Sequence, residues 1–426
     1  MTESAPPSLL HGMWQYPLFE ALYGRRSRRF GLGFELSEGP FQYQSRTGPL
    51  PLSELEEALL VAAGVGVTGT PLWDMGRPRA QGGGDGRTFG STTNGRRTAL
   101  FFTNDDGVYV IDPGSITATK VREVETPDER EKVLGLYGRH RRKLRDGRLN
   151  IPRHLPPLFA HNLWDSNMTG CTLFMPVCDV SEALIVVIAL LVAGLVGRSG
   201  GMYVVDDRHG SRPAGTEKWV NSGLLDREKV LPLSVLERQA CYFMFSEPAV
   251  ICQNIFLATE ALGVGGWMHC GFLSAPVLQG LGFRTVVPGV PPSLPNPVGL
   301  DGMFEGRCPP YVPDMDAAVE AVLSGRRQIP AGGLESQGAR PYSMSDADYR
   351  AGLRDLSDEG LACTKAICNY IYDTYGRFPG TVDTMHLMWF MQVHHLDLDF
   401  YDSRFKAEMC SDTHRRHMAM WHQHPA

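Results

Sequence analysis

The stretch from Thr98 to Ile111 constrains the fold more than any other feature of the chain. Two runs rich in apolar, β-branched and aromatic residues, 98–103 (TALFFT) and 108–111 (VYVI), flank the turn sequence Asn-Asp-Asp-Gly. This pattern predicts a β-hairpin, and a hairpin pairs its two strands antiparallel. We therefore expect a sheet that contains antiparallel strands.

A glycine-rich run at 64–69 (GVGVTG) matches the GxGxxG pattern of dinucleotide-binding folds. That fingerprint needs a strand before the glycines and a helix after them, so that a pyrophosphate meets the helix N-terminus. Here the preceding segment, 51–63, has helical spacing and a capping box formed by Ser53 and Glu56. The glycines follow a helix, so we assign them to a helix exit and a loop.

The remaining elements follow from hydrophobic spacing and from glycine and proline punctuation. Gly263 is expected to end an apolar helix in the C′ position. Strands are expected at 172–177, 202–205, 266–271 and 284–288. Helices are expected at 126–148, 183–197, 248–263, 275–280, 314–324, 346–376 and 381–400, and the proline-rich stretch 291–313 is expected to be an extended linker or wrapping arm.

Composition narrows the classes of partner. The 426 residues suggest about two or three domains, and an apolar content of 43% is enough for a well-packed core. A formal net charge of −6 gives no general attraction to polyanions. The basic stretch 139–148 is read as a solvated helix end or a face packed on a partner chain, in preference to a nucleic-acid patch.

The nine cysteines include no CxxC pair, which argues against a disulfide framework and against a zinc ribbon and favours a reducing cytosol. The N-terminal residues lack the pattern of a signal peptide. The longest apolar run, 183–197, has 15 residues, fewer than the ~20 that span a bilayer. We expect a cytoplasmic protein with neither a membrane nor a nucleic acid as its partner.

Three segments carry side chains suited to a phosphorylated, planar cofactor with polar edges. The first, 25–30 (RRSRRF), supplies guanidinium groups for a phosphate. The second, 90–96 (GSTTNGR), supplies hydroxyls, an amide and flexible backbone. The third, 266–271 (GWMHCG), offers a glycine amide that a flat ligand can approach closely, because no Cβ stands in the way.

In order and spacing these motifs resemble the FMN-dependent nitroreductase family. That family has an Arg-x-Ser motif on its first helix, a Ser-x-x-Asn loop before its first strand, and a Gln-Asn helix that ends in Ala-Leu-Gly before a turn facing the flavin. The matching segments here are 25–29, 91–94 and 253–263. The resemblance covers 15–112 and 248–290, about a third of the chain.

The resemblance implies the following FMN contacts. The phosphate and ribityl chain would be held by Arg25, Ser27 and Arg29, with Arg26 close by. The isoalloxazine edge would be contacted by the loop residues Ser91, Thr92, Thr93 and Asn94. The Gly271 amide would hydrogen-bond the flavin N5, in a turn where His269 and Cys270 are the neighbouring candidates for a catalytic role.

Two departures from the family pattern affect the chemistry. Arg96 stands where the family has Gln, and a cation there would stabilise the anionic reduced flavin. Met268-His269-Cys270 replaces the usual Pro-x-Glu before the N5 glycine. The family also has a basic phosphate ligand near its C-terminus, for which Arg307 or Arg284 is eligible.

The resemblance further implies an α+β nitroreductase-like fold, with a mainly antiparallel sheet flanked by helices, and a homodimer with FMN at its interface. It divides the chain into a first core part (1–112), an insertion with core elements (113–247), a second core part with a wrapping arm (248–313) and a helical extension (314–426). The C-terminal part, through the segments 296–302 (NPVGLDG), 308–311 (CPPY) and 413–422 (THRRHMAMWH), resembles an actinobacterial-type branch with this layout. The reaction implied is hydride transfer between FMN and a small-molecule substrate, with NAD(P)H as a candidate electron donor.

Two polar stretches of the insertion stand out, 162–167 (NLWDSN) and 206–212 (DDRHGSR), and either could bind substrate or form internal pairs. We expect the insertion and the C-terminal helices to cover the open face of the cofactor.

Two alternatives stay open. The first is a metal-dependent enzyme: on a helix, His395 with Asp399 and His394 with Asp397 would have metal-binding spacing, although a polar helix face is the preferred explanation. The terminal histidines His414, His417, His422 and His424 are expected at the surface. The second alternative is a protein that binds flavin without redox turnover.

Overall fold

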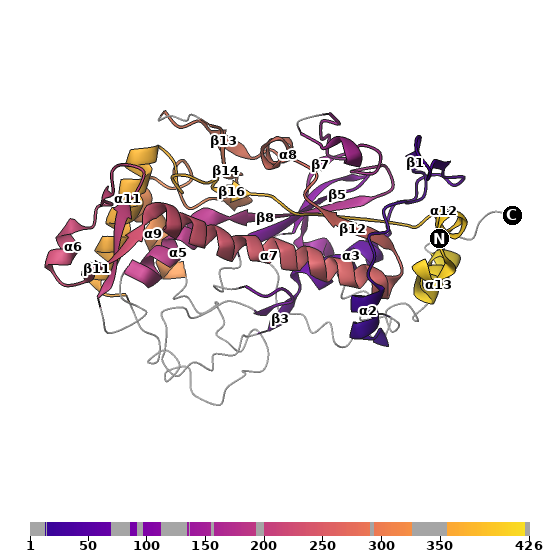
Figure 1. Cartoon of the computed structure of the whole chain (residues 1–426), viewed down its shortest axis with the longest axis horizontal. Coiled ribbons are helices and arrows are strands. Elements are labelled where there is room, and N and C mark those ends of the chain that lie inside the picture. The colour runs from indigo at the N-terminus through magenta and orange to yellow at the C-terminus, as the bar shows by residue number, and fades with distance from the viewer. Residues whose placement is uncertain are drawn as a thin grey trace.

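The computed structural model describes residues 13, 15–69, 86–91, 97–111, 134–135, 137–154, 157–192, 200–289, 294–325 and 356–421. One long helix, α7 (Leu233–Leu262), runs along a central sheet (Figure 1). The sheet has the strand order β12-β17-β8-β5-β6-β7, with β16 also paired to β8, and each of these pairs is antiparallel. The protein is therefore α+β, with a mainly antiparallel central sheet and helices beside it, as expected.

The strands of this sheet are β5 (Thr98–Thr103), β6 (Gly107–Ile111), β7 (Arg141–Asp146), β8 (Thr172–Asp179), β12 (Gly265–His269), β16 (Met385–His386) and β17 (Phe390–His394). Smaller sheets join β1 (Glu35–Leu36) to β2 (Tyr43–Gln44), β3 (Val67–Gly69) to β4 (Gly86–Arg87), β9 (Gly201–Asp206) to β10 (Arg212–Pro213) and β11 (Leu225–Pro232), and β14 (Asn296–Leu300) to β13 (Arg284–Val286) and β15 (Phe304–Glu305).

Helices gather at both ends of α7 (Figure 1). At its N-terminal end lie α5 (Val180–Val192), α6 (Glu217–Asn221), α9 (Met315–Gly325) and α11 (Asp358–Tyr375). Near its C-terminal end lie α2 (Leu18–Gly24), α3 (Glu54–Val65), α12 (Leu398–Arg404) and α13 (Asp412–Trp421). The short α8 (Ser274–Leu281) follows β12, and two 3₁₀ turns cover Ala160–Asn162 and Ala407–Met409.

Several sequence predictions are confirmed. The hairpin forms with Leu100 opposite Ile111, and all the residues of its two strands are buried. The capping box also forms: Ser53 accepts from the Glu56 amide while the Glu56 carboxylate accepts from the Ser53 amide. The GxGxxG pattern starts in the last turn of α3, which contains Gly64, so a helix precedes it as expected. Its second half differs from the expected loop, because 67–69 form the short strand β3. Gly263 ends α7 in the left-handed conformation, with φ of 92°.

The expected helix at 381–400 is wrong. This stretch contains β16, the fully buried strand β17 between β12 and β8, and only the first residues of α12. A strand in the middle of a sheet has its backbone groups paired on both sides, and this tertiary pairing overrides local preference. The histidine–aspartate spacing inferred from one continuous helix therefore does not exist.

The helix expected at 126–148 is also wrong over its described C-terminal part, because 141–146 forms the edge strand β7. Charged side chains on an edge strand discourage pairing with further chains. The stretch 291–313 likewise contains β14 and β15 in addition to extended chain. The helix predicted at 248–263 begins earlier, at Leu233, with Pro248 inside it, so the expected boundary at 247/248 falls within one helix.

By length and composition α7 could also cross a membrane, but half of its most apolar window is buried inside the protein. The sheet, α3 and α5 all pack against it. Its apolar residues are those of a core helix.

Gly263 gives a test of how α7 is joined to α13. A Cβ at this position would lie 2.6 Å from the Thr413 carbonyl oxygen and 2.7 Å from His417 Cβ. Gly223 also has positive φ, 81°, but a Cβ there would meet nothing within 4 Å. We expect Gly223→Ala to cost about 1–2 kcal/mol of unfolding free energy, the cost of the left-handed conformation alone. Gly263→Ala should cost roughly 1–3 kcal/mol more, because the packed backbone must move.

Urea unfolding of the two variants measures this difference. Equal losses would show that α13 is not packed against the end of α7.

Candidate active site

The arginine motif follows α2 as an extended segment and is not part of a helix. α2 ends at Gly24, and Arg25 has an extended ψ of 122°. The chain then runs beside the end of β17, where Leu32 donates its amide to the His395 carbonyl oxygen at 3.0 Å. The motif of the resembled family lies on its first helix, so the chain differs from that pattern here.

Arg28 is the buried member of the motif, with 4% of its surface exposed. Its Nη1 lies 2.6 Å from Glu260 Oε1, and its Nε donates to the Met409 carbonyl oxygen at 2.8 Å. Sequence reasoning missed this pair, although Glu260 is an acidic residue in an otherwise apolar stretch of helix. The pair fixes the motif to the C-terminal end of α7.

Arg26 is exposed and Arg25 is half-buried. The Arg25 guanidinium carbon lies 4.8 Å from the centre of the Phe256 ring. Arg26 Nη1 donates to the carbonyl oxygens of Tyr23 and Arg25 at 2.8 and 2.9 Å. Within the described part of the chain neither guanidinium forms an ion pair with an acidic side chain, so both charges are available to an anion.

Arg29 connects the motif to the other segment that sequence reasoning assigned to the flavin. Its Nε lies 2.5 Å from Asp165 Oδ2, its Nη2 donates to Asn162 Oδ1 at 2.8 Å, and its guanidinium carbon lies 4.0 Å from the centre of the Trp267 ring. A Cβ on Gly271 would collide with the Asn162 amide nitrogen. Asn162 therefore touches both Arg29 and Gly271, and the stretch 162–167 is part of the candidate site.

His269 is buried beside these residues, and its ring stacks on Trp267 with centres 4.0 Å apart. The Gly271 amide donates to His269 Nδ1 at 3.1 Å, which places the ring proton on Nε2. Burial, with a smaller contribution from the Arg29 charge, lowers the pKa of His269 to about 3. The imidazole is therefore neutral at physiological pH and cannot act there as an imidazolium proton donor.

Two buried N–H donors in this cluster have no acceptor among the described residues. They are His269 Nε2 and Trp267 Nε1. A buried donor without an acceptor costs about 1–3 kcal/mol, so such groups are rare unless a ligand or water satisfies them. The pair therefore marks a place where an acceptor from outside the chain would be stabilised.

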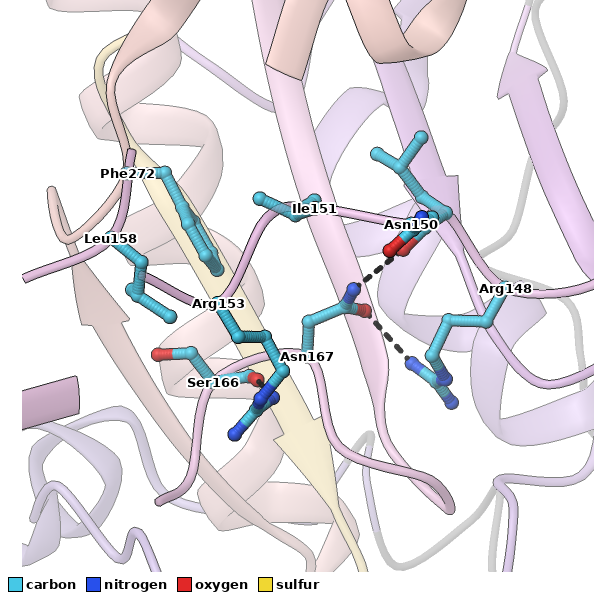
Figure 2. A pocket seen from close by; sticks show the side chains of 9 residues that line it. Arg148, Asn150, Ile151, Arg153, Leu158, Ser166, Asn167 and Phe272 are labelled. Atoms are coloured by element: carbon cyan, nitrogen blue, oxygen red, sulfur yellow. Dashed lines mark hydrogen bonds between the residues drawn. The ribbon is translucent and has the colours of Figure 1, made fainter. Parts of the chain in front are cut away.

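A cavity of about 230 Å³ adjoins this cluster (Figure 2). Phe272 and Ser166, which directly follow Gly271 and Asp165, line it. The Ser166 hydroxyl is buried and has no partner in the described structure. The other lining residues are Arg148, Leu149, Asn150, Ile151, Arg153, Leu158 and Asn167.

The two arginines of the cavity are held differently. Arg148 pairs with Asp105, with Nη2 and Oδ1 2.5 Å apart, whereas Arg153 donates to the carbonyl oxygen of Ser166 at 2.8 Å and also to that of Leu163. No acidic side chain in the described residues pairs with Arg153. The cavity therefore combines an aromatic wall, a hydroxyl without a partner in the described residues and a cation that forms no ion pair there.

Ser91 and Arg307 lie in a second neighbourhood. Ser91 donates to Glu247 Oε1, Thr98 donates to Glu247 Oε2 at 2.6 Å, and Arg307 Nε lies 3.2 Å from Glu182 Oε2. Glu247 precedes Glu260 by 13 positions in α7, a separation of about 20 Å along the helix. One chain does not bring Ser91 to the arginine motif.

The other candidates are placed as follows. Cys270 is a free, exposed thiol, and Ser27 is exposed. Arg284 pairs with Asp301 at the surface, 2.7 Å apart. Thr92, Thr93, Asn94 and Arg96 lie outside the described residues. The assignment of all these residues to FMN stays a prediction.

The histidines of the C-terminal part do not form the pairs expected from sequence. Asp397 caps α12 by accepting from the Phe400 amide at 3.0 Å, while His395 points to Glu56 and His417. The expectation that His414 and His417 lie at the surface is wrong, because both are buried. His422 and His424 lie outside the described residues.

Comparisons with known proteins give a distant structural likeness. No family model matches the chain, and no curated protein matches it. Among solved structures, the chain is similar to a "putative nitroreductase" from Ralstonia eutropha JMP134, with 15% sequence identity, coverage of 67% of this chain and 79% of that one, and a TM-score of 0.29. Such a low TM-score does not equate the two folds, so functional inference rests on the residues themselves.

The buried carboxyl of Asp165 predicts a pH dependence of stability. Burial raises the pKa of Asp165 to about 6, even though Arg29 acts in the opposite direction. The folded chain therefore binds a proton that the unfolded chain releases near pH 4, so this carboxyl makes stability fall as pH rises from about 4 to 6. The fall is on the order of 3 kcal/mol, and we expect Asp165→Asn to remove it.

Urea unfolding of wild type and variant from pH 4 to 7 checks the difference between the two curves. Asp301→Asn is the control, because hydrogen bonds from Tyr311 and Arg284 lower the pKa of Asp301. Parallel curves for wild type and Asp165→Asn would contradict the prediction.

Proposed function

We propose that this protein is an FMN-dependent oxidoreductase that acts as a homodimer on a small organic substrate. The order of the Arg25–Arg29, Ser91–Asn94 and 253–271 motifs supports a flavin. The spatial meeting of the first and last of these motifs at Asn162 supports it further, because residues about 240 positions apart share one polar side chain.

One observation carries the proposal: the stacked Trp267 and His269 rings hold two buried N–H donors without acceptors in the described residues. The edge of an isoalloxazine ring carries several nitrogen and oxygen acceptors. Arg25 and Arg26 lie on the same stretch of chain as Arg29, whose guanidinium packs on Trp267. A ligand with a planar acceptor edge and an anionic end would satisfy both sets of groups.

FMN, when bound, would supply hydride transfer at its N5 atom. The chain would contribute phosphate binding by Arg25 and Arg26 and donation of N–H groups by Trp267 and His269. Asp165 already neutralises Arg29, so Arg29 would act mainly by fixing the Trp267 ring. The Gly271 amide is donated to His269, so the N5 contact implied by the resemblance requires His269 to release it.

The cavity beside Phe272 is the proposed substrate pocket. Its aromatic wall, the Ser166 hydroxyl and the Arg153 guanidinium suit a small planar molecule with an acidic or nitro group. NAD(P)H is the proposed electron donor, binding in turn with the substrate.

The exposed face of α2 supports the homodimer. Leu18, Phe19, Leu22 and Tyr23 are exposed by 62, 69, 42 and 77%, and the Phe19 and Tyr23 rings stack on each other. Contiguous apolar side chains of this kind mark protein interfaces. Because α2 ends where the arginine motif begins, a second copy seated on α2 would lie beside the phosphate-binding arginines. The Ser91 loop of the second copy could then complete the cofactor site beside the arginine motif of the first.

The visible spectrum of the purified protein, with identification of the released chromophore, is the first test of the flavin. Trp267→Phe then tests the carrying observation, because Phe keeps an aromatic ring under Arg29 and removes the N–H, together with part of the indole volume. We expect about a tenfold rise in the Kd for FMN, the effect of one hydrogen bond.

Trp164→Phe is the matched control, since Trp164 also lies against Arg29, 5.4 Å from its guanidinium carbon, and its indole nitrogen is not a buried unpaired donor. Equal FMN affinity in wild type and both variants would remove the support that Trp267 gives. Bound FMN that neither NADH nor NADPH bleaches under anaerobic conditions would favour a flavin-binding protein without turnover.

The dimer is tested with Phe19→Asp combined with Tyr23→Asp. Charges on this face should shift the sedimentation coefficient from that of a dimer to that of a monomer, and should weaken FMN binding if two chains complete each site. Tyr242→Asp, at a residue on α7 that is 61% exposed, is the control and should leave the dimer intact. Dimers that persist in the double variant would exclude α2 from the interface.

A further inference from the structure

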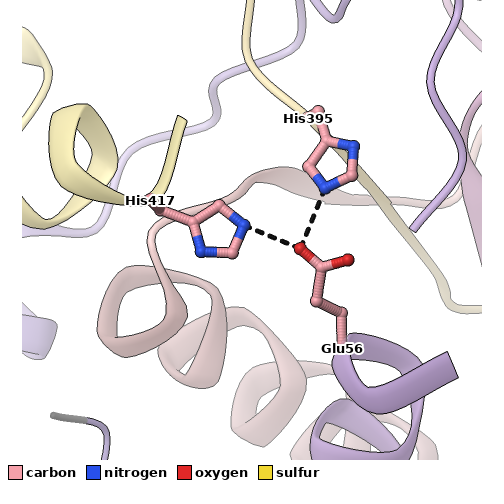
Figure 3. A group of neighbouring side chains, drawn as sticks. All are labelled: Glu56, His395 and His417. Carbon is pink, nitrogen blue, oxygen red and sulfur yellow. Dashed lines mark hydrogen bonds and ion pairs between the residues drawn. The ribbon is translucent and has the colours of Figure 1, made fainter. Parts of the chain in front are cut away.

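Glu56, His395 and His417 form a buried cluster that shares no residue with the candidate flavin site, and Figure 3 shows the two imidazoles pointing at the Glu56 carboxylate. They come from the first turn of α3, the residue after β17 and the middle of α13. Each side chain is only 1–2% exposed. Three segments spread over more than 360 positions thus place one carboxylate and two imidazoles together inside the protein.

The two oxygens of Glu56 have different tasks. Oε2 accepts from the Ser53 amide at 2.6 Å and completes the capping box of α3. Oε1 faces both imidazoles, 2.9 Å from His395 Nε2 and 2.7 Å from His417 Nε2. The capping bond fixes the orientation of the carboxylate, so Oε1 is held toward the histidines.

The backbone sets the tautomer of His395. Its Nδ1 lies 3.0 Å from the Leu50 carbonyl oxygen, which can only accept, so Nδ1 carries a proton. In a neutral His395 the lone pair of Nε2 then faces Glu56 Oε1, and two acceptors meet with nothing between them. Metal-bound histidines commonly donate their second ring nitrogen to a backbone carbonyl in this way, which directs the other nitrogen at the metal.

We propose that Glu56, His395 and His417 bind a divalent transition-metal ion, with zinc as the best match, through Oε1 and the two Nε2 atoms. The donor set of two imidazoles and one carboxylate is one that Zn²⁺ and Fe²⁺ accept. All three donor atoms already lie within 4.8 Å of one another. Tetrahedral zinc with bonds of ~2.1 Å would separate them by about 3.4 Å, so each nitrogen needs to move by roughly half an ångström.

The three protein ligands leave one tetrahedral position for a water, and because all three are buried we infer a structural role for the ion. The ion would join α3, the end of β17 and α13, and would be taken up as the chain folds. His417 also packs against Gly263, so the same ion would hold α13 at the C-terminal end of α7. The proposal concerns stability and does not depend on a bound flavin.

Protons are the competing occupants of the cluster. A protonated His395 and a neutral His417 could both donate to Glu56 Oε1, which gives a cluster without net charge. Burial acts to raise the pKa of Glu56, but the charge and hydrogen bonds of His395 and His417 outweigh it and hold this pKa well below its usual range. A direct measurement of metal binding distinguishes a metal ion from a proton as the occupant of the cluster.

The test uses the full-length protein after removal of metals by a chelator and dialysis, titrated with Zn²⁺ or Co²⁺. We expect one ion per chain, a tetrahedral Co²⁺ absorption spectrum and a rise in Tm of several degrees on adding Zn²⁺. Glu56→Gln keeps the volume and the capping bond but loses the anionic ligand, and should weaken binding at least about 100-fold. His417→Gln on the last described helix is a second variant should Glu56→Gln fail to fold.

His414→Ala is the matched control. His414 is also buried on α13, one turn before His417, but it bonds Ser411 and offers no ligand to the cluster. Its loss should leave the metal stoichiometry at one. A protein that takes up neither ion, or that binds equally in wild type, Glu56→Gln and His417→Gln, would overturn the proposal.

Discussion

The buried carboxylates of α7 organise the rest of the structure. Glu237, Glu247 and Glu260 are each at most 1% exposed, at the start, middle and end of the helix. A carboxylate is buried only if hydrogen bonds or an opposite charge compensate for its lost hydration. Each glutamate therefore has a specific partner. Glu237 accepts hydrogen bonds from the 380–381 loop, Glu247 accepts them from Ser91 and from the first residue of β5, and Glu260 accepts one from Arg28.

This arrangement explains why the two halves of the expected cofactor site lie apart within one chain. The arginine motif is attached at Glu260 and the Ser91 loop at Glu247, so the length of α7 between these two glutamates sets the distance between the motifs. A helix cannot bend enough to close that distance. In the proposed homodimer a second chain would supply the missing motif, since the apolar face of α2 lies next to the arginine motif.

Sequence reasoning succeeded where the determining contacts are local. The capping box of Ser53 and Glu56 and the hairpin at 98–111 are each determined by residues close together in the sequence, and both form. It failed for 381–400, because burial on both faces of a central strand comes from β8 and β12, which lie far away in the chain. For the same reason Glu56 could be identified as a helix cap but not as the partner of His395 and His417, which lie 339 and 361 positions away.

The helix α13 connects the cluster of Glu56, His395 and His417 to the arginine motif of the candidate flavin site. Its backbone and His417 pack against Gly263, one residue after α7 ends, and the preceding turn gives the Met409 carbonyl oxygen to Arg28. Arg28 in turn holds the segment that presents Arg25, Arg26 and Arg29. Whatever occupies the space between Glu56, His395 and His417 therefore fixes the helix against which the arginine motif is positioned. An ion there would act on cofactor binding only through the placement of this segment, because no ligand of the ion belongs to the candidate flavin site.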